Sequence, residues 1–221
     1  MSPSLLSHKI EESIKEDIFT GKLQAGQKIS IVEMEEKWGT SSTPVRDAIK
    51  SLATKGLLVV APRESIKIAT LSRKLVKEMF ELKIALECAA IEIALPQIPQ
   101  PVIEETLEKC KTASRLFAST KDLKQLFKID HLVHQLIRDH CDNDRLLKIL
   151  GDVTDVVDWA RSVGINQLQT MEFAAPEQLH ILNMMRRKDT VAAQEAMRIH
   201  LRNLYRRTIE SIDSVDGRVT P

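Results

Sequence analysis

The chain has 221 residues, and its 32 Lys and Arg nearly balance its 31 Asp and Glu, so net charge alone does not indicate a polyanionic partner. No run of eighteen apolar residues occurs, which excludes a transmembrane helix, and the acidic, amphipathic first residues do not resemble a signal peptide. Three cysteines without a paired or metal-binding spacing favour buried, reduced thiols in a cytoplasmic protein; they are Cys88, Cys110 and Cys141.

Three helices are predicted in close succession at the N-terminus. Apolar residues at every fourth position indicate an amphipathic helix over residues 4–20. Ser30 followed by Glu33 resembles a capping box, which predicts a short helix through Trp38. Residues 39–42 form a tight turn into a third helix, and this order is a helix-turn-helix arrangement.

The third helix has the composition of a helix that enters a DNA groove. Thr43 is expected to be its N-cap, with Pro44 in the first helical position and Gly56 just past its end. Arg46 and Lys50, four residues apart, share one face. An apolar back on the other side would hold the helix in the fold; its residues are Val45, Ala48, Ile49 and Leu52.

Two short β-prone runs follow, at residues 57–61 and 65–70, and they predict a hairpin. Three helices followed by a hairpin make a winged helix, whose wing can reach phosphate or the minor groove. The candidate DNA-binding residues on the third helix and the wing are Ser41, Ser42, Thr43, Arg46, Lys50, Arg63 and Lys67.

The rest of the chain predicts an all-α bundle, because glycine is scarce and alternating patterns are few. We expect a DNA-binding domain over 1–71, a helical domain over 72–213 and a disordered tail over 214–221. Ser72 is expected to cap the first helix of the bundle. Its inward residues are predicted to be Leu75, Met79, Leu82, Leu86 and Ala90. The predicted helices cover 72–95, 102–118, 121–141, 143–165, 174–187 and 190–211.

The sequence resembles the GntR family of bacterial winged-helix regulators in the runs GKLQAGQKI, TPVRDAIKSLATKGLL and PRESIKIATLSRK. The helical half resembles the FadR-type branch, which carries an FCD domain. The resemblance implies that Arg46 is the main recognition arginine. Ser42 stands where the family often has Arg, and Glu64-Ser65 stands near its usual Arg-Gly pair. These departures bear on the operator sequence more than on DNA binding.

The helical half also contains a set of residues suited to bind a metal. Asp130 and His134 are four residues apart and share a helix face, and His200 lies on the last predicted helix. Imidazole and carboxylate groups that converge inside a bundle are a common way to hold a divalent metal. A single Asp-His pair is also common as a solvated or self-bonded pair.

The family resemblance extends to this set. DHLVHQLIRDHCDN resembles the FCD motif at Asp130, His134 and Asn143, and the last two helices align with the family without a gap. Gln178 stands where the family commonly completes the site with a further His directly after a Glu. His180 is two residues later, about 200° around a helix, and should face elsewhere.

Three alternatives follow for this site. In the first, Asp130, His134 and His200 hold a divalent metal (Zn, Ni or Mn), with Gln178 or water completing the shell. In the second, the metal is lost and the same four residues line a polar pocket that binds an effector directly. In the third, the helix shifts so that His180 reaches the site.

The sequence as a whole predicts a ligand-responsive transcriptional regulator that is not an enzyme. It would bind a pseudo-palindromic DNA operator as a homodimer and respond to a small carboxylate or another metabolite. One rival is a metal-dependent hydrolase that uses the Asp/His set, although it would need a general base that the spacing does not supply. Another is a DNA-binding dimer without an effector.

Overall fold

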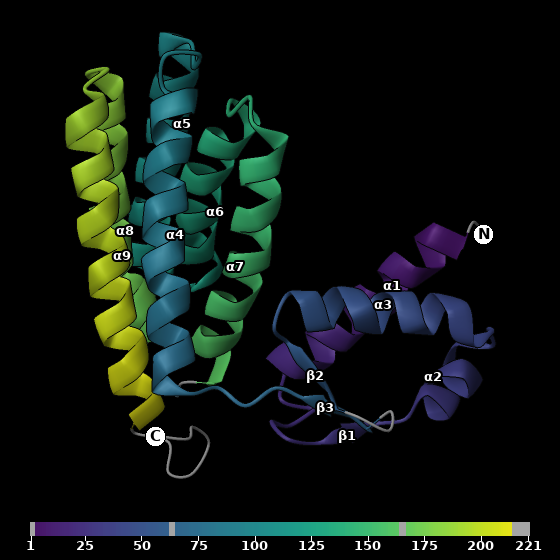
Figure 1. The fold of residues 1–221 in the computed structure, drawn as a ribbon. Helices are drawn as coiled ribbons and strands as arrows, with labels where there is room; N and C mark the ends of the chain where they lie inside the picture. The colour runs from purple at the N-terminus through teal and green to yellow at the C-terminus, as the bar shows by residue number, and fades with distance from the viewer. Residues whose placement is uncertain (1–2, 62–64, 164–166, 214–221) are drawn as a thin grey trace. The chain divides into compact units, whose positions relative to one another are not determined.

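The computed structural model describes residues 3–61, 65–163 and 167–213, and helices predominate in it (Figure 1). The described residues divide into two compact units. The first contains the chain up to Val76 together with the end of the seventh helix from Asp155, and the second contains most of the chain from Lys77 onward. This architecture confirms the predicted fold class, a winged helix-turn-helix followed by a helical bundle.

The first unit holds three helices and a small antiparallel sheet. Its strands have the order β1-β3-β2. Strand β1 has only two residues, too short to show an alternating pattern, and the sequence did not predict it. The elements are α1 (Pro3–Phe19), β1 (Lys28–Ile29), α2 (Ile31–Trp38), α3 (Ser42–Thr54), β2 (Leu58–Ala61) and β3 (Ser65–Ile68).

Helix α3 begins two residues earlier than its sequence suggests. Ser41, not Thr43, is the N-cap, and its side chain makes no capping hydrogen bond. Pro44 therefore lies in the first turn rather than at the first position. It is tolerated there because the first four N–H groups of a helix have no intrahelical acceptor. The end is as predicted, with Gly56 at φ +81° just after the C-cap Lys55.

The apolar back of α3 packs against α1 and the sheet, as its spacing predicts. Val45 and Leu52 are fully buried, and Ile10 and Ile14 of α1 lie in the same core. The sheet contributes Ile66, whose neighbours along β3 point to the opposite face.

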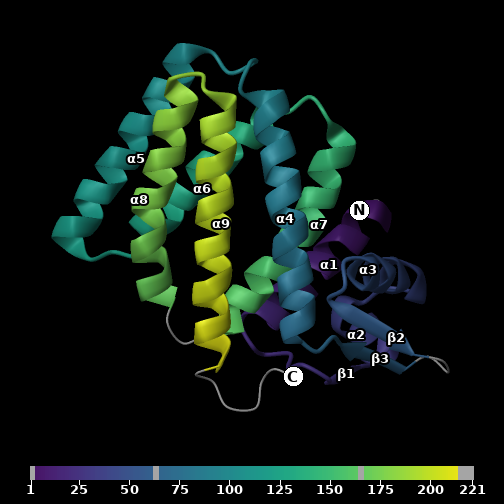
Figure 2. The same ribbon diagram turned by 60° about the vertical axis from the view of Figure 1, so that its left-hand side comes forward.

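The second unit contains most of six helices, which lie side by side in a bundle (Figure 2). Ser72 caps α4 as predicted, since its Oγ accepts a hydrogen bond from the N–H of Leu75 at 3.1 Å. Helix α8 begins seven residues before the predicted start, so Pro176 lies inside it rather than in its first turn. The helices are α4 (Arg73–Ala94), α5 (Gln100–Thr120), α6 (Lys124–Asp139), α7 (Asp144–Val163), α8 (Gln167–Arg186) and α9 (Thr190–Asp213).

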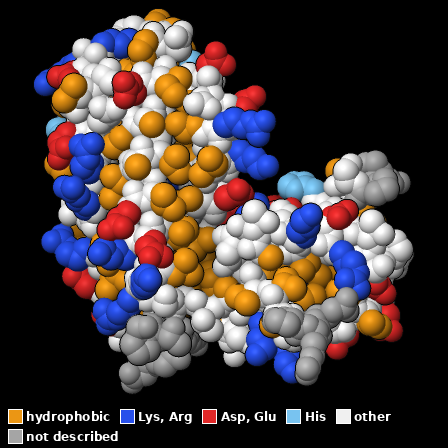
Figure 3. Space-filling model, in the orientation of Figure 1, with side chains coloured by type: hydrophobic (Ala, Val, Ile, Leu, Met, Phe, Trp, Pro, Cys, Tyr) orange, Lys and Arg blue, Asp and Glu red, His pale blue; other side chains and the backbone are white. Residues whose placement is uncertain are grey.

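The inward face predicted for α4 is wrong. Leu82 is 47% exposed and only Ala90 of the predicted set is fully buried, whereas Lys83 and Glu87 point into the bundle. Helix α4 carries two apolar stripes, and the sequence reading chose the one that charged residues do not interrupt. Figure 3 shows hydrophobic side chains along the outer face of α4. The buried residues of α4 are Val76, Phe80, Lys83, Glu87, Cys88, Ala90, Ile91 and Ala94.

Candidate DNA-binding surface and metal centre

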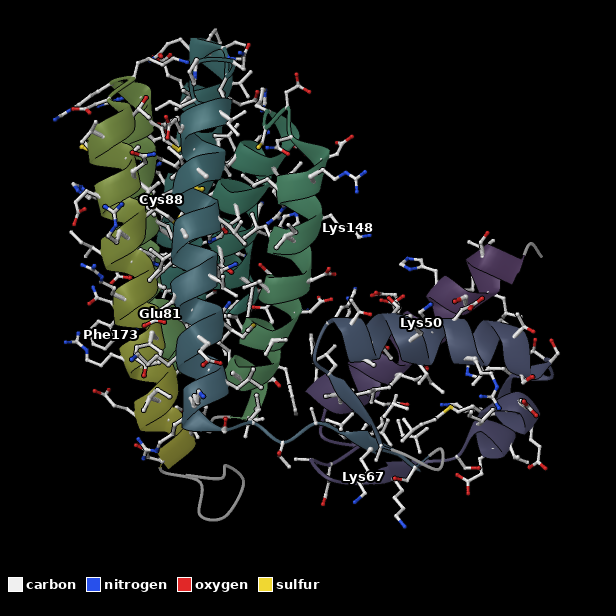
Figure 4. All side chains as sticks on the ribbon, in the orientation of Figure 1. Lys50, Lys67, Glu81, Cys88, Lys148 and Phe173 are labelled. Atoms are coloured by element: carbon white, nitrogen blue, oxygen red, sulfur yellow. The ribbon has the colours of Figure 1, made fainter. Side chains whose placement is uncertain are left out.

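The outer face of α3 carries the polar and cationic residues that the sequence assigns to DNA. Arg46 and Lys50 are both exposed, and Ser41 and Thr43 at the start of the helix are exposed as well. Ser42 is half-buried. Lys50 is labelled on α3 in Figure 4. Because the buried back of the helix fixes its orientation, these side chains form one continuous surface.

A groove of about 500 Å³ runs between α3 and the sheet. Its lining includes the cations Arg46 and Lys50 and the apolar side chains of Ile31 and the exposed Val60. Cations can contact phosphate oxygens or guanine, while apolar side chains can contact a sugar or a thymine methyl group. The groove therefore combines the two kinds of contact that a DNA strand offers.

Lys67 lies on the solvent face of the sheet, directly opposite Lys28 on β1 (Figure 4). Directly opposed like charges destabilise a strand pair, so this face is suited to an anionic partner. The sequence reading missed Lys28, because its pairing with Lys67 depends on the unpredicted strand β1. Arg63, the other predicted wing residue, lies outside the described residues.

The bundle brings together the Asp/His set predicted from the sequence. Asp130 and His134 project from α6 and His200 from α9, and one ligand atom from each lies within 4.8 Å of the others. Gln178 of α8 joins them, because its Nε2 donates a hydrogen bond to Asp130 Oδ1. Gln178 is 1% exposed and His200 is fully buried.

Each imidazole is held from behind by a glutamate. His134 Nδ1 lies 2.8 Å from Glu87 Oε1, in an oblique approach, and His200 Nδ1 lies 2.9 Å from Glu177 Oε2. His134 Nε2 is then 3.8 Å from Asp130 Oδ1. His200 Nε2 is buried and has no hydrogen-bond partner among the described residues. A carboxylate hydrogen-bonded to Nδ1, as Glu177 is to His200, fixes the tautomer that leaves Nε2 free to bind a metal.

The glutamates are themselves held by cations. Glu177 accepts hydrogen bonds from both terminal nitrogens of Arg207, at 2.9 and 3.0 Å, and another from Asn203. Glu87 lies 3.4 Å from Lys83 Nζ, which also donates to the hydroxyl of Thr154 at 2.7 Å. Both carboxylates are therefore charged parts of a connected polar network.

The pKa shifts agree with this arrangement. Burial raises the pKa of Glu177, but hydrogen bonds from His200, Arg207 and Asn203 outweigh it and lower the pKa to about 2. Burial likewise opposes ionisation of Glu87, yet His134 and Lys83 lower its pKa to about 2. Burial lowers the pKa of His200, so its imidazole is neutral near pH 7 and Nε2 carries a lone pair.

These residues fit a divalent metal. A lone pair on a buried, unpartnered imidazole nitrogen faces a carboxylate and a second imidazole at a spacing that one ion can bridge. The sequence reading did not assign roles to Lys83, Glu87 or Arg207. The feature that could have identified the first two is their i,i+4 spacing in phase with the buried residues of α4.

Other histidines and motif residues lie away from the cluster. His180 is exposed on α8, so the shift that would bring it into the site finds no support here. His8 and His131 are also exposed, and His140 bonds to the carbonyl of Leu136. Asn143 caps α7, because its Oδ1 accepts from the N–H of Leu146.

None of the helices in the described ranges combines the length and apolarity that crossing a bilayer requires.

Comparison with known proteins identifies both halves of the chain. The model of the bacterial regulatory proteins of the gntR family matches residues 6–68, and the FCD domain model matches residues 78–203. The HTH-type transcriptional regulator YdhC of Bacillus subtilis (strain 168) is 25% identical over 190 residues, which cover 85% of this chain and 84% of YdhC. The HTH-type transcriptional repressor RspR of Escherichia coli (strain K12) is 24% identical over 199 residues, which cover 90% of this chain and 87% of RspR.

The fold is also that of a solved structure. Escherichia coli McbR/YncC superposes with a TM-score of 0.72 at 17% identity, covering 93% of this chain and 97% of that one. The families and relatives indicate a DNA-binding transcriptional regulator rather than an enzyme, and nothing in them supports the hydrolase alternative.

Proposed function

We propose that this chain, which belongs to the GntR family of bacterial regulatory proteins and is a transcriptional regulator of the FCD type, acts as a homodimer on a pseudo-palindromic operator and responds to a small acid effector. The observation that carries the proposal is that one chain contains two candidate sites. One is the exposed cationic face of α3, and the other is the buried polar cluster of the bundle.

Operator recognition would rest on Arg46. An arginine on the outer face of a helix that fits the major groove can bind guanine through two hydrogen bonds, which contribute about 1–3 kcal/mol to discrimination. Lys50 and the hydroxyls of Ser41, Ser42 and Thr43 would add contacts to bases or phosphates. Lys67, with Lys28 beside it, would add contacts to phosphates that carry no sequence information.

The test is Arg46→Ala, measured on a DNA site selected by the wild-type protein from a random pool. Specific affinity should fall by about tenfold or more, while binding to random DNA falls much less. Lys22→Ala, which removes another exposed cation of the same unit, is the matched control. If Arg46→Ala bound the selected site as tightly as wild type, α3 would not be the recognition helix.

Dimerisation would use the outer stripe of α4. Its apolar residues alternate in steps of four and three, which is the spacing of a two-helix seam. Leu82 is exposed, and the others are half-buried although each is apolar. The stripe consists of Leu75, Met79, Leu82, Leu86, Ala89 and Ile93.

Leu82→Glu tests this surface by placing a charge at the centre of the stripe. We expect it to convert a dimer into a monomer in sedimentation equilibrium. Leu116→Glu is the matched control, because Leu116 on α5 is 44% exposed and lies off the stripe. A dimer that persisted in Leu82→Glu would exclude the α4 stripe as the interface.

The effector site would be the cluster of Asp130, His134, Gln178 and His200. FCD domains are known to bind metals, and a divalent metal held by Asp130, His134 and His200 would act as a Lewis acid that anchors the effector's carboxylate. Glu87 and Glu177 would orient the two imidazoles. If no metal binds, the same polar side chains would have to contact the acid directly.

Elemental analysis of protein purified without a His-tag, stripped with a chelator and reloaded, separates these alternatives. We expect stoichiometric metal in the wild type and in His131→Ala, an exposed neighbour on α6, but not in His200→Ala. If the wild type held no stoichiometric metal, the remaining alternative would be that the polar side chains bind the effector directly. A thermal-shift screen with small carboxylates addresses the effector itself, since a ligand of the folded state raises apparent stability.

A further inference from the structure

Gln178 is the least conventional member of the cluster. It is 1% exposed, and its amide has two chemically different ends. Nε2 donates to Asp130 Oδ1, while Oε1 is buried and has no hydrogen-bond partner among the described residues. An unpaired buried carbonyl oxygen carries a free-energy cost, so its presence beside an Asp/His cluster requires an explanation.

A bound cation would reverse the preferred orientation of this amide. In the present arrangement the partly positive NH2 group points at the carboxylate that a cation would also contact. A divalent ion at Asp130 would repel that group and attract the carbonyl end. Rotation about the terminal side-chain bond exchanges the two ends without moving the helix, because the amide is nearly symmetric in shape.

The loaded site would then offer two imidazole nitrogens, one carboxylate oxygen and one amide oxygen. Imidazole favours Zn²⁺ and Ni²⁺, while carboxylate and carbonyl oxygens favour harder ions such as Mn²⁺. An equal mixture of the two donor types reduces the advantage that a nitrogen-rich site gives to Zn²⁺. The residue that decides the mixture is Gln178, because the two imidazoles lie against Glu87 and Glu177 and Asp130 offers only carboxylate oxygens.

We propose that Gln178 is the residue that sets the cation preference of this site, by turning Oε1 onto the ion and favouring Mn²⁺ relative to Zn²⁺. The proposal rests on the metal-bound form of the proposed function. It adds a ligand, an orientation change and a direction of selectivity that the three-residue cluster does not itself contain.

The experiment measures Mn²⁺ and Zn²⁺ dissociation constants on chelator-stripped, full-length, untagged protein by competition with a metal indicator. Gln178→His should tighten Zn²⁺ binding by at least about tenfold more than Mn²⁺ binding. Gln178→Leu should weaken Mn²⁺ binding by at least about tenfold. Loss of a residue that only supports a metal ligand already weakens binding by about 10–100-fold, so loss of a ligand should cost at least the lower figure. His180→Ala, two residues away on the exposed side of α8, should leave both constants unchanged.

A second readout follows the amide itself. The side-chain ¹⁵N–¹H₂ resonances of Gln178, assigned by their loss in Gln178→Leu, should shift when diamagnetic Zn²⁺ is added. Circular dichroism and urea unfolding confirm that each variant is folded.

The outcomes separate this inference from the proposed metal site. If His200→Ala abolishes binding but both Gln178 variants keep wild-type constants, the metal site stands and the role of Gln178 is overturned. If Gln178→His strengthens Mn²⁺ and Zn²⁺ equally, the selectivity claim is overturned. If the wild type binds neither ion, both the metal site and this inference are wrong.

Discussion

The buried ion pair of α4 gives the sharpest stability prediction. Lys83 Nζ lies 3.4 Å from Glu87 Oε1, and the two side chains are 6% and 1% exposed. At that separation the attraction is about 5 kcal/mol for an effective dielectric constant of 20, and it opposes the desolvation cost of the two buried charges. Lys83→Met removes one charge and leaves the other buried, a change that typically costs about 3–5 kcal/mol.

In Lys83→Met, His134 still contacts Glu87, so we expect the loss of unfolding free energy to lie at the lower end of this range, about 3 kcal/mol. For a chain of this length, that corresponds to a fall of about 6–12 °C in Tm. The assay is urea unfolding at fixed protein concentration with chelator present, because metal or dimer formation would change the apparent stability.

Lys77→Met is the matched control. It is the same substitution on the same helix, and Lys77 pairs with Glu81 at 3.7 Å, but both side chains are more than 60% exposed. Such a pair contributes less than about 1 kcal/mol. The double variant Lys83→Met/Glu87→Gln should lose less than the sum of its two single variants, because the neutral amide no longer needs a cation. Equal losses in Lys83→Met and Lys77→Met, or additive single losses, would refute the reasoning.

Two further predictions use the same unfolding assay. The pKa of Glu177 is lowered to about 2 from an ordinary value of 4.5, so the stability it contributes is present above pH 4.5 and is lost as the pH falls toward 2. The difference between wild type and Glu177→Gln should therefore shrink over that interval in chelator-treated protein, and a difference independent of pH would contradict the assignment. Ser72→Ala should lower the unfolding free energy by about 1 kcal/mol, because it removes the hydroxyl that accepts from the N–H of Leu75. Ser72→Thr keeps a hydroxyl and should retain most of the stability that the cap contributes. An equal loss of unfolding free energy in both variants would exclude the cap as the cause.

The order of the elements could be predicted from the sequence, whereas the inward face of α4 could not. Helix periodicity and caps identified every helix in the described residues, because each has a continuous buried stripe or a clear breaker beside it. They failed on α4, where two stripes compete and the buried one contains Lys83 and Glu87. Periodicity treats a charge as a mark of the surface, and it has no information about a partner on another helix.

The same limit applies to the cluster. The i,i+4 spacing placed Asp130 and His134 on one face of α6, His200 was recognised on the last predicted helix, and the family resemblance added Gln178. Only the three-dimensional arrangement shows that Glu87 and Glu177 lie behind the imidazoles, since they come from α4 and α8. Contacts between residues 23 to 47 positions apart leave no pattern within a single helix.

These two limits meet in one helix. Leu82 and Lys83 are consecutive, as are Leu86 and Glu87, so the outer stripe and the buried pair alternate along α4. The carboxylate beside His134 and the surface proposed for dimerisation are therefore carried by the same turns of one helix. A substitution that makes the inward face more conventional, such as Glu87 to Leu, would strengthen the amphipathic pattern while removing the group that orients the imidazole. The two functions proposed for the faces of α4 would explain its irregular pattern.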